Sequence, residues 1–174
     1  MQTYLANLDL TELWRDSDYY TSPDEITGER VNEAEKRLGY KLPKSYIELI
    51  KNKNGGSPAN DCFRTEMPTS WAKDHIAITS IKGLGGNWGI DSESFGSDDA
   101  IEEWGYPKIG IVICDCPSAG HDVVMLDYRK NGQAGEPEIV HIETECDEPM
   151  ITFLAKDFET FIKGLESSEN FDFE

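Results

Sequence analysis

Apolar side chains recur at helical spacing in the first third of the chain, and strand-like runs follow. In residues 3–14 the apolar positions predict a short helix within an N-terminal arm, residues 1–20. The next helix is predicted to start at Ser22, because Ser22 and Glu25 stand at the spacing of a capping box, and to continue to Leu38. The N-terminal part of the chain is therefore expected to be largely helical.

A tight turn and a third helix are predicted to follow directly. Gly39 comes after the last helical position and suits the left-handed backbone of a helix C-cap, which a residue without Cβ adopts freely. Pro43 has the fixed φ and the missing N–H that suit a first helical turn. Apolar positions then repeat at helical spacing from Tyr46 until an Asn-Gly-Gly sequence at residues 54–56 ends the helix.

The pattern beyond Gly56 changes to that of strands. Four runs rich in Ile and Val predict strands at residues 76–81, 109–114, 123–128 and 138–142. The connections between the later strands are too short for parallel crossovers, which favours an antiparallel meander. Apolar positions at helical spacing between Leu154 and Leu165 predict a C-terminal helix lying on the sheet.

Together these elements predict one α+β domain. It consists of a mainly antiparallel sheet of about four to six strands, packed against N-terminal helices and a C-terminal helix. The predicted bounds of the domain are residues 21–166. An acidic tail without a basic residue, residues 167–174, is expected to fray.

Residues 35–56 resemble the signature of the SUKH superfamily, the Smi/Knr-type group. The signature reads E-x-x-L-G-x-x-L-P-x-x-Y, followed by a short helix and N-G-G. Its positions in this chain are Glu35, Leu38, Gly39, Leu42, Pro43, Tyr46, Asn54, Gly55 and Gly56. The resemblance implies a single α+β domain. It also implies either a bacterial immunity protein, which binds and silences a polymorphic or contact-dependent toxin, or a regulator similar to the fungal members, which act in cell-wall assembly.

The net charge of −18 is unevenly distributed along the chain. Between Arg30 and Lys53 there are seven basic and three acidic residues, which leaves nine basic and 31 acidic residues elsewhere. Such a field repels nucleic acids and anionic membranes and accelerates the encounter with a basic protein. An acidic surface also serves solubility alone. We therefore expect a basic protein partner and neither nucleic acid nor membrane as a partner.

The cysteine content and the N-terminus indicate a reducing compartment. Four cysteines are too few for a disulfide scaffold in a chain of 174 residues. Residues 1–5 lack the basic and apolar regions of a signal peptide, and no apolar run reaches the roughly 20 residues that span a bilayer. We expect a cytoplasmic protein with free thiols; no sequence feature indicates its oligomeric state.

Two loops suggest ligand chemistry but are incomplete. The glycine-rich residues 83–89 lack the third glycine of a dinucleotide loop and the lysine of a phosphate loop, so a tight turn is expected. The segment from Asp91 to Glu102 partly matches a calcium loop, but Phe95 stands where an oxygen ligand belongs. We therefore expect neither a cofactor nor a calcium ion at these loops.

Cysteine and histidine also suggest chemistry without completing a motif. Cys114 and Cys116, with His121 and Asp122 nearby, could bind zinc, but one C-x-C pair does not match the paired motifs of structural zinc sites. Two small core residues are therefore the preferred interpretation, and no metal is expected. The sequence contains no Gly-x-Ser-x-Gly motif and no recognisable nucleophile–base arrangement, so a non-enzyme with no catalytic residues is predicted.

Acidic residues framed by aromatic ones form the predicted partner-binding surface. Its residues are Trp88, Asp91, Glu93, Phe95, Asp98, Asp99, Glu102, Glu103 and Trp104. Aromatic side chains anchor a protein partner, while carboxylates steer and select it. The prediction is an immunity protein that binds a basic toxin domain, with a nuclease as the expected class of toxin. The alternatives are a regulatory scaffold of the Smi/Knr type and a small-ligand or metal-binding domain; a solvated loop with tryptophans in the core would explain the cluster structurally.

Overall fold

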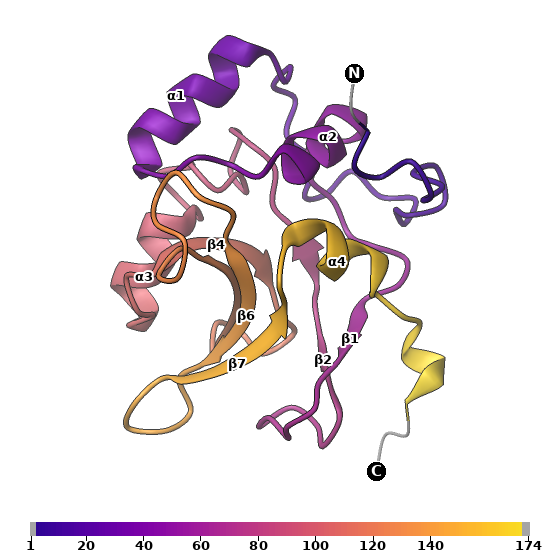
Figure 1. Cartoon of the computed structure of the whole chain (residues 1–174), viewed down its shortest axis with the longest axis vertical. Helices are drawn as coiled ribbons and strands as arrows, with labels where there is room; N and C mark the ends of the chain where they lie inside the picture. The colour runs from indigo at the N-terminus through magenta and orange to yellow at the C-terminus, as the bar shows by residue number, and fades with distance from the viewer. Residues whose placement is uncertain (1–2, 172–174) are drawn as a thin grey trace.

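An antiparallel sheet of five strands runs through the molecule (Figure 1). The computed structural model describes residues 3–171. The strands lie in the order of the chain and form a meander, with a separate antiparallel pair, β1 and β2, beside it. Their bounds are β1 Cys62–Arg64, β2 His75–Ala77, β3 Ser80–Ile81, β4 Gly110–Asp115, β5 Asp122–Asp127, β6 Glu138–Glu143 and β7 Met150–Ala155.

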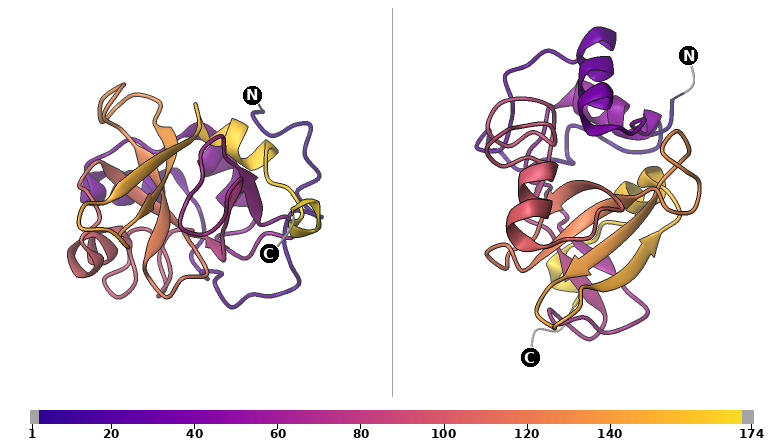
Figure 2. Two further views of the ribbon diagram at one scale, coloured as in Figure 1. Left: turned by 90° about the horizontal axis from the view of Figure 1, so that it is seen from below. Right: turned by 90° about the vertical axis from the view of Figure 1, so that its left-hand side faces the viewer.

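Helices lie against both sides of this sheet (Figures 1 and 2). Their bounds are α1 Gly28–Leu38, α2 Lys44–Asn52, α3 Ser97–Trp104, α4 Phe158–Lys163 and the 3-10 helix η1 Ser168–Asn170. Helix α4 packs against α2 and against β6 and β7, whereas α3 packs against β4. The predicted class, a single α+β domain with an antiparallel sheet, is confirmed.

Alternate residues of the strands face two different apolar clusters. On one side Ile111 and Val124 belong to the main core, which also contains the buried side chains of α2 and α4. On the other side Val112 and Met125 pack with Ile101 of α3 in a smaller cluster. Both faces of β4 and β5 are therefore withdrawn from water, which is why these strands read as continuous apolar runs in the sequence.

The signature residues form the frame of the helix pair. Gly39 ends α1 with a left-handed backbone, φ 82°, as predicted. The Glu35 carboxylate accepts a hydrogen bond from the backbone N–H of Leu42 at 3.0 Å and thereby fixes the turn between the helices. Pro43 is the N-cap of α2, so the helix begins one residue later than its first-turn proline suggested.

Two buried side chains of the signature fasten α2 to the segment after β3. The Tyr46 hydroxyl donates a hydrogen bond to the carbonyl oxygen of Lys82 at 2.6 Å. The Asn54 amide accepts from the N–H of Leu84 at 2.8 Å and donates to the carbonyl of Leu84 at 3.0 Å. These contacts satisfy backbone groups that the interior would otherwise leave without partners.

The N-terminal arm differs from its prediction. Residues 3–14 form turns, so the predicted short helix is wrong. The N–H groups of Tyr4 and Leu5 donate to the Glu48 carboxylate at 2.8 and 3.3 Å, a tertiary contact that replaces helical hydrogen bonds. Residues 1 and 2 of the predicted arm lie outside the described residues. Helix α1 also starts later than Ser22, since Thr27 is its N-cap and accepts from the N–H of Arg30 at 3.1 Å.

Several other elements also differ from the sequence pattern. The predicted strand 76–81 is divided between β2 and β3, which belong to different sheets. Helix α3 and the strands β1 and β7 were not predicted. The tail was expected to fray from residue 167, but residues 167–171 are ordered. The buried ring of Phe171 stacks on His75 with the ring centroids 4.1 Å apart. Residues 172–174 of the predicted tail lie outside the described residues.

Gly55 lies where the backbone after α2 closely approaches the segment after β3, and this contact predicts how substitutions affect stability. Gly55 and Gly39 have nearly the same backbone, φ 88° and 82°, but a Cβ at Gly55 would lie 2.8 Å from the Gly83 nitrogen. A Cβ at Gly39 would meet nothing within 4 Å. Gly39→Ala should therefore cost about 1 kcal/mol from backbone strain alone. Gly55→Ala should cost about 1–3 kcal/mol more, as a forced contact does.

Urea denaturation of both variants measures this difference, with Gly39→Ala as the matched control. Equal losses of unfolding free energy in the two variants would show that the close backbone approach at residue 55 contributes nothing.

Candidate functional site

A cleft of about 370 Å³ lies between α3, the loop before it and the turn that joins β4 to β5. We call it the acidic cleft, because its lining is mainly aromatic and carboxylate side chains. Its aromatic residues are Tyr20, Trp88, Phe95, Trp104 and Tyr106, and its acidic residues are Asp99, Glu103, Asp115 and Asp122. These residues come from the N-terminal arm, the loop between β3 and α3, α3 and the residues just after it, the end of β4 and the start of β5.

One wall of the acidic cleft is a stack of aromatic rings. The Trp88 ring lies 4.6 Å from the Phe95 ring in a stacked arrangement, and 5.1 Å from Tyr20, centroid to centroid. Tyr19 lies 5.6 Å from Trp88 on the outside of the stack. Phe95 remains 50% exposed, which leaves a large apolar surface available to a partner.

The buried side chain of Lys82 supports this wall from below. Lys82 is only 2% exposed, and its Nζ lies 3.1 Å from the Asp115 carboxylate. The same Nζ donates to the carbonyl oxygen of Phe95 at 2.9 Å. The lysine therefore neutralises one carboxylate of the cleft and fixes the backbone that carries the ring stack.

Helix α3 presents carboxylates on the opposite wall. Ile101 packs onto the sheet, and the buried Ser97 hydroxyl accepts from the N–H of Val112 at 2.8 Å, so the orientation of the helix is fixed. Asp98 and Asp99 lie in its first turn, where carboxylates stabilise a helix. Within residues 3–171, none of the four α3 carboxylates, Asp98, Asp99, Glu102 and Glu103, forms an ion pair.

The end of α3 packs against the turn between β4 and β5. The Trp104 ring covers Gly120, where a Cβ would lie 2.5 Å from the ring. The Tyr106 hydroxyl donates a hydrogen bond to the carbonyl of the same glycine. Burial, together with the charge of Asp122, raises the pKa of Tyr106, so this phenol stays protonated at neutral pH.

Five of the nine residues predicted for the partner surface line the acidic cleft. They are Trp88, Phe95, Asp99, Glu103 and Trp104. Asp98 and Glu102 are exposed on α3 beside the cleft. The two remaining residues lie toward α1. The exposed Glu93 side chain lies 3.9 Å from Arg37. The prediction that Asp91 belongs to the partner surface is corrected, because its side chain is buried and pairs with Arg30 at 2.7 Å.

The structure also assigns Asp91 a role in the loop. Its second carboxylate oxygen accepts from the N–H of Gly85 at 2.8 Å, which closes the glycine-rich turn that the sequence predicts. The segment from Asp91 to Glu102 does not have the form of a calcium loop, because α3 begins at Ser97, the seventh position, and Asp91 at the first position pairs with Arg30.

The zinc set considered from the sequence is not assembled either. Cys114 is buried in the main core, whereas the His121 side chain is half exposed and lies 3.6 Å from Glu145. All four cysteines are free thiols, as predicted, and Cys146 is exposed. Burial raises the pKa of Cys62 to about 12, so this thiol is unreactive in the folded protein.

Sequence reasoning missed several lining residues of the cleft. Tyr20, Tyr106, Asp115 and Asp122 lie outside the contiguous acidic run, and Lys82 was not expected to be buried beneath it. The pairing of β3 with β4 and of β4 with β5 brings Lys82, Asp115 and Asp122 together. A lysine within an apolar, strand-like segment was the one local sign of a buried cation.

The class of protein follows from the fold and from the signature residues. The chain is a single-domain α+β protein in which the α1–α2 pair with the SUKH-type signature is hydrogen-bonded to the loop that lines the cleft. The chain belongs to the SMI1 / KNR4 family (SUKH-1), whose family model matches residues 25–164. A search of curated proteins finds no match to the chain. Among the residues that the structure describes, no helix has the length and apolar character needed to cross a membrane.

Lys82 provides a test of how the cleft is supported. Lys82→Met removes a buried ammonium and leaves the Asp115 carboxylate and the Phe95 carbonyl without their partner, so we expect a loss of about 2–4 kcal/mol in unfolding free energy. The matched control is Lys41→Met. Lys41 also lies 3.0 Å from a carboxylate, that of Glu35, but it is exposed, so its loss should cost at most about 1 kcal/mol.

Chemical denaturation of the two variants gives both values. A Lys82→Met variant as stable as Lys41→Met would mean that the ring stack does not depend on the buried lysine.

Proposed function

We propose that this chain is an immunity protein that binds and neutralises a basic toxin domain through the acidic cleft and α3. The observation that carries the proposal is the set of four unpaired carboxylates on α3 beside an open aromatic stack. Like charges crowded on one short helix oppose folding, and a cationic partner would relieve that repulsion. Membership of the SMI1 / KNR4 family supports a protein that acts by binding.

The acidic cleft suits a lysine or arginine side chain of the partner. The half-exposed ring of Phe95, stacked on Trp88, is available to a cation, and Asp99 and Glu103 offer carboxylate oxygens across the cleft. Because Lys82 already neutralises Asp115, the α3 carboxylates supply the charge that remains for a partner. The aromatic faces add contact area that a purely electrostatic surface lacks.

A nuclease is the toxin class that fits this surface best. Nucleases hold phosphates with lysine and arginine on the face that performs catalysis, so a carboxylate-rich surface competes there as a polyanion. The immunity protein would then need no catalytic residues of its own. Binding would occlude the substrate face and would weaken as salt screens the opposed charges.

Charge reversal in the cleft tests this proposal. Asp99→Lys with Glu103→Lys should weaken binding to the toxin module encoded beside the chain's own gene by at least about tenfold, mainly through slower association. The matched control is Glu66→Lys with Glu169→Lys, which changes the net charge equally at two exposed positions outside the cleft. Surface plasmon resonance at two salt concentrations measures rates and affinity, and survival of cells that express the toxin measures protection.

Equal weakening by the two double variants would show that net charge and not the acidic cleft governs binding. A chain that neither binds nor protects against that neighbouring toxin, but associates with several cellular proteins, would instead support the regulatory alternative.

A further inference from the structure

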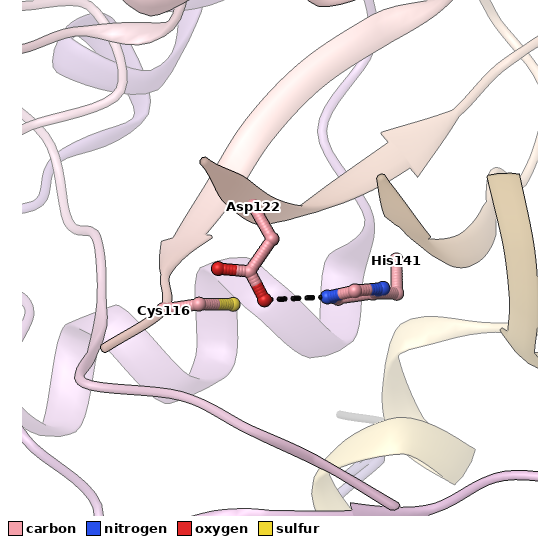
Figure 3. Close-up of side chains that lie close together, drawn as sticks. All are labelled: Cys116, Asp122 and His141. Carbon is pink, nitrogen blue, oxygen red and sulfur yellow. Dashed lines mark hydrogen bonds and ion pairs between the residues drawn. The ribbon is translucent and has the colours of Figure 1, made fainter. Parts of the chain in front are cut away.

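Three buried side chains converge behind the wall of the acidic cleft. Cys116 follows β4, Asp122 begins β5, and His141 lies in β6 (Figure 3). One donor atom of each residue, the Cys116 Sγ, an Asp122 oxygen and a His141 nitrogen, lies within 4.8 Å of the other two. Figure 3 shows the cysteine sulfur and the imidazole on either side of the Asp122 carboxylate.

The sheet itself creates this convergence. Val124 pairs with His141 in the β5–β6 register, so Asp122, two residues before Val124, lies on the same face of the sheet as the histidine. The register of β4 shifts between Val112 and Cys114. This bulge turns Cys116 toward the main core instead of the α3 side, and so toward the other two side chains.

Two atoms of the group have no hydrogen-bond partner among the residues described. His141 Nε2 lies 2.7 Å from one Asp122 oxygen, and the Cys116 thiol interacts with the same carboxylate. The second oxygen, Oδ1, and His141 Nδ1 are buried and unpartnered. A buried polar atom without a partner costs about 1–3 kcal/mol, and of these two Asp122 Oδ1 is the atom that a bound ion would satisfy. Neighbouring Glu143 does not supply the missing contact, because its carboxylate accepts from the N–H of Ser70 at 2.9 Å.

We propose that Cys116, Asp122 and His141 form a binding site for one Zn²⁺ ion whose fourth coordination position opens to the acidic cleft. Thiolate, carboxylate and imidazole are the donors that zinc takes in proteins. Bonds of roughly 2.0–2.3 Å place tetrahedral donors about 3–4 Å apart. The three donor atoms lie within 4.8 Å of one another, so a small adjustment of the side chains would bring all three to one ion. Cys116 and Asp122 line the cleft, so the ion would be reached from that side.

Metal binding at this site replaces protons. The Cys116 thiol releases its proton to solvent, and the imidazole proton of His141 moves to Nδ1 so that the Nε2 lone pair faces the ion. Water or a donor side chain of a partner would occupy the fourth position. The site does not depend on the toxin-binding proposal, and each can fail without the other.

Titration of the chelator-treated chain with Zn²⁺ tests the site directly. We expect one ion per chain in competition with a chromogenic chelator, and a rise in the unfolding temperature on the order of 5–10 °C at a hundredfold excess over the dissociation constant. Co²⁺ as a second probe should give the visible bands of tetrahedral coordination and a thiolate-to-metal charge-transfer band. Both signals should disappear with chelator.

Variants separate this site from adventitious binding. Cys116→Ala and His141→Gln should each weaken Zn²⁺ binding at least about a hundredfold. The matched control is the double variant Cys146→Ala with His121→Gln, which removes an exposed cysteine and an exposed histidine near the same turn and should leave binding unchanged.

Two results would overturn the proposal. The first is a Co²⁺ complex of the unaltered chain without a thiolate band, a measurement that does not depend on whether a buried variant folds. The second is Zn²⁺ binding that is lost in the Cys146 and His121 control, which would assign the ion to the surface.

Discussion

The attachment of α2 to the segment after β3 is the constraint on which the rest of the structure depends. Tyr46 and Asn54 satisfy three backbone groups of that segment, and Gly55 lets the two backbones approach where no Cβ would fit. Such contacts are specific because a buried amide or carbonyl without a partner costs more than the hydrogen bond itself contributes. The loop that leads to α3 therefore leaves the core at one fixed position.

This fixed position allows a cation to be buried in a strongly acidic chain. Lys82 directly follows β3, where Tyr46 holds its carbonyl oxygen and the Ile113 carbonyl holds its N–H. From this fixed backbone its Nζ reaches both the Asp115 carboxylate and the Phe95 carbonyl. The charge of Lys82 therefore compensates the Asp115 carboxylate within the protein. The α3 carboxylates receive no such compensation within the described residues, so they place uncompensated negative charge beside the half-exposed ring of Phe95.

The local signals in the sequence explain which elements could be predicted. The α1–α2 turn was recoverable because Gly39 and Pro43 act through their own backbone, and β4 to β6 because strands buried on both faces give long apolar runs. The N-terminal arm was misread, since the Glu48 carboxylate, more than forty residues away, captures its N–H groups. Helix α3 was missed because carboxylates in its first turn, a helix-start signal, were interpreted only as surface charge.

The same distinction applies to the site. The acidic and aromatic residues between Trp88 and Trp104 could be selected from the sequence because they lie close together along the chain. The sequence could not show that Asp91 is buried among them, since its partner Arg30 lies on the distant helix α1. His141 was inside a predicted strand, yet nothing local connects it with Cys116 or Asp122. Strand register and one bulge make that connection, and both are set by pairing across the sheet. Groups of buried polar residues are therefore identified by the orphaned atoms they contain, such as Asp122 Oδ1, and not by spacing along the chain.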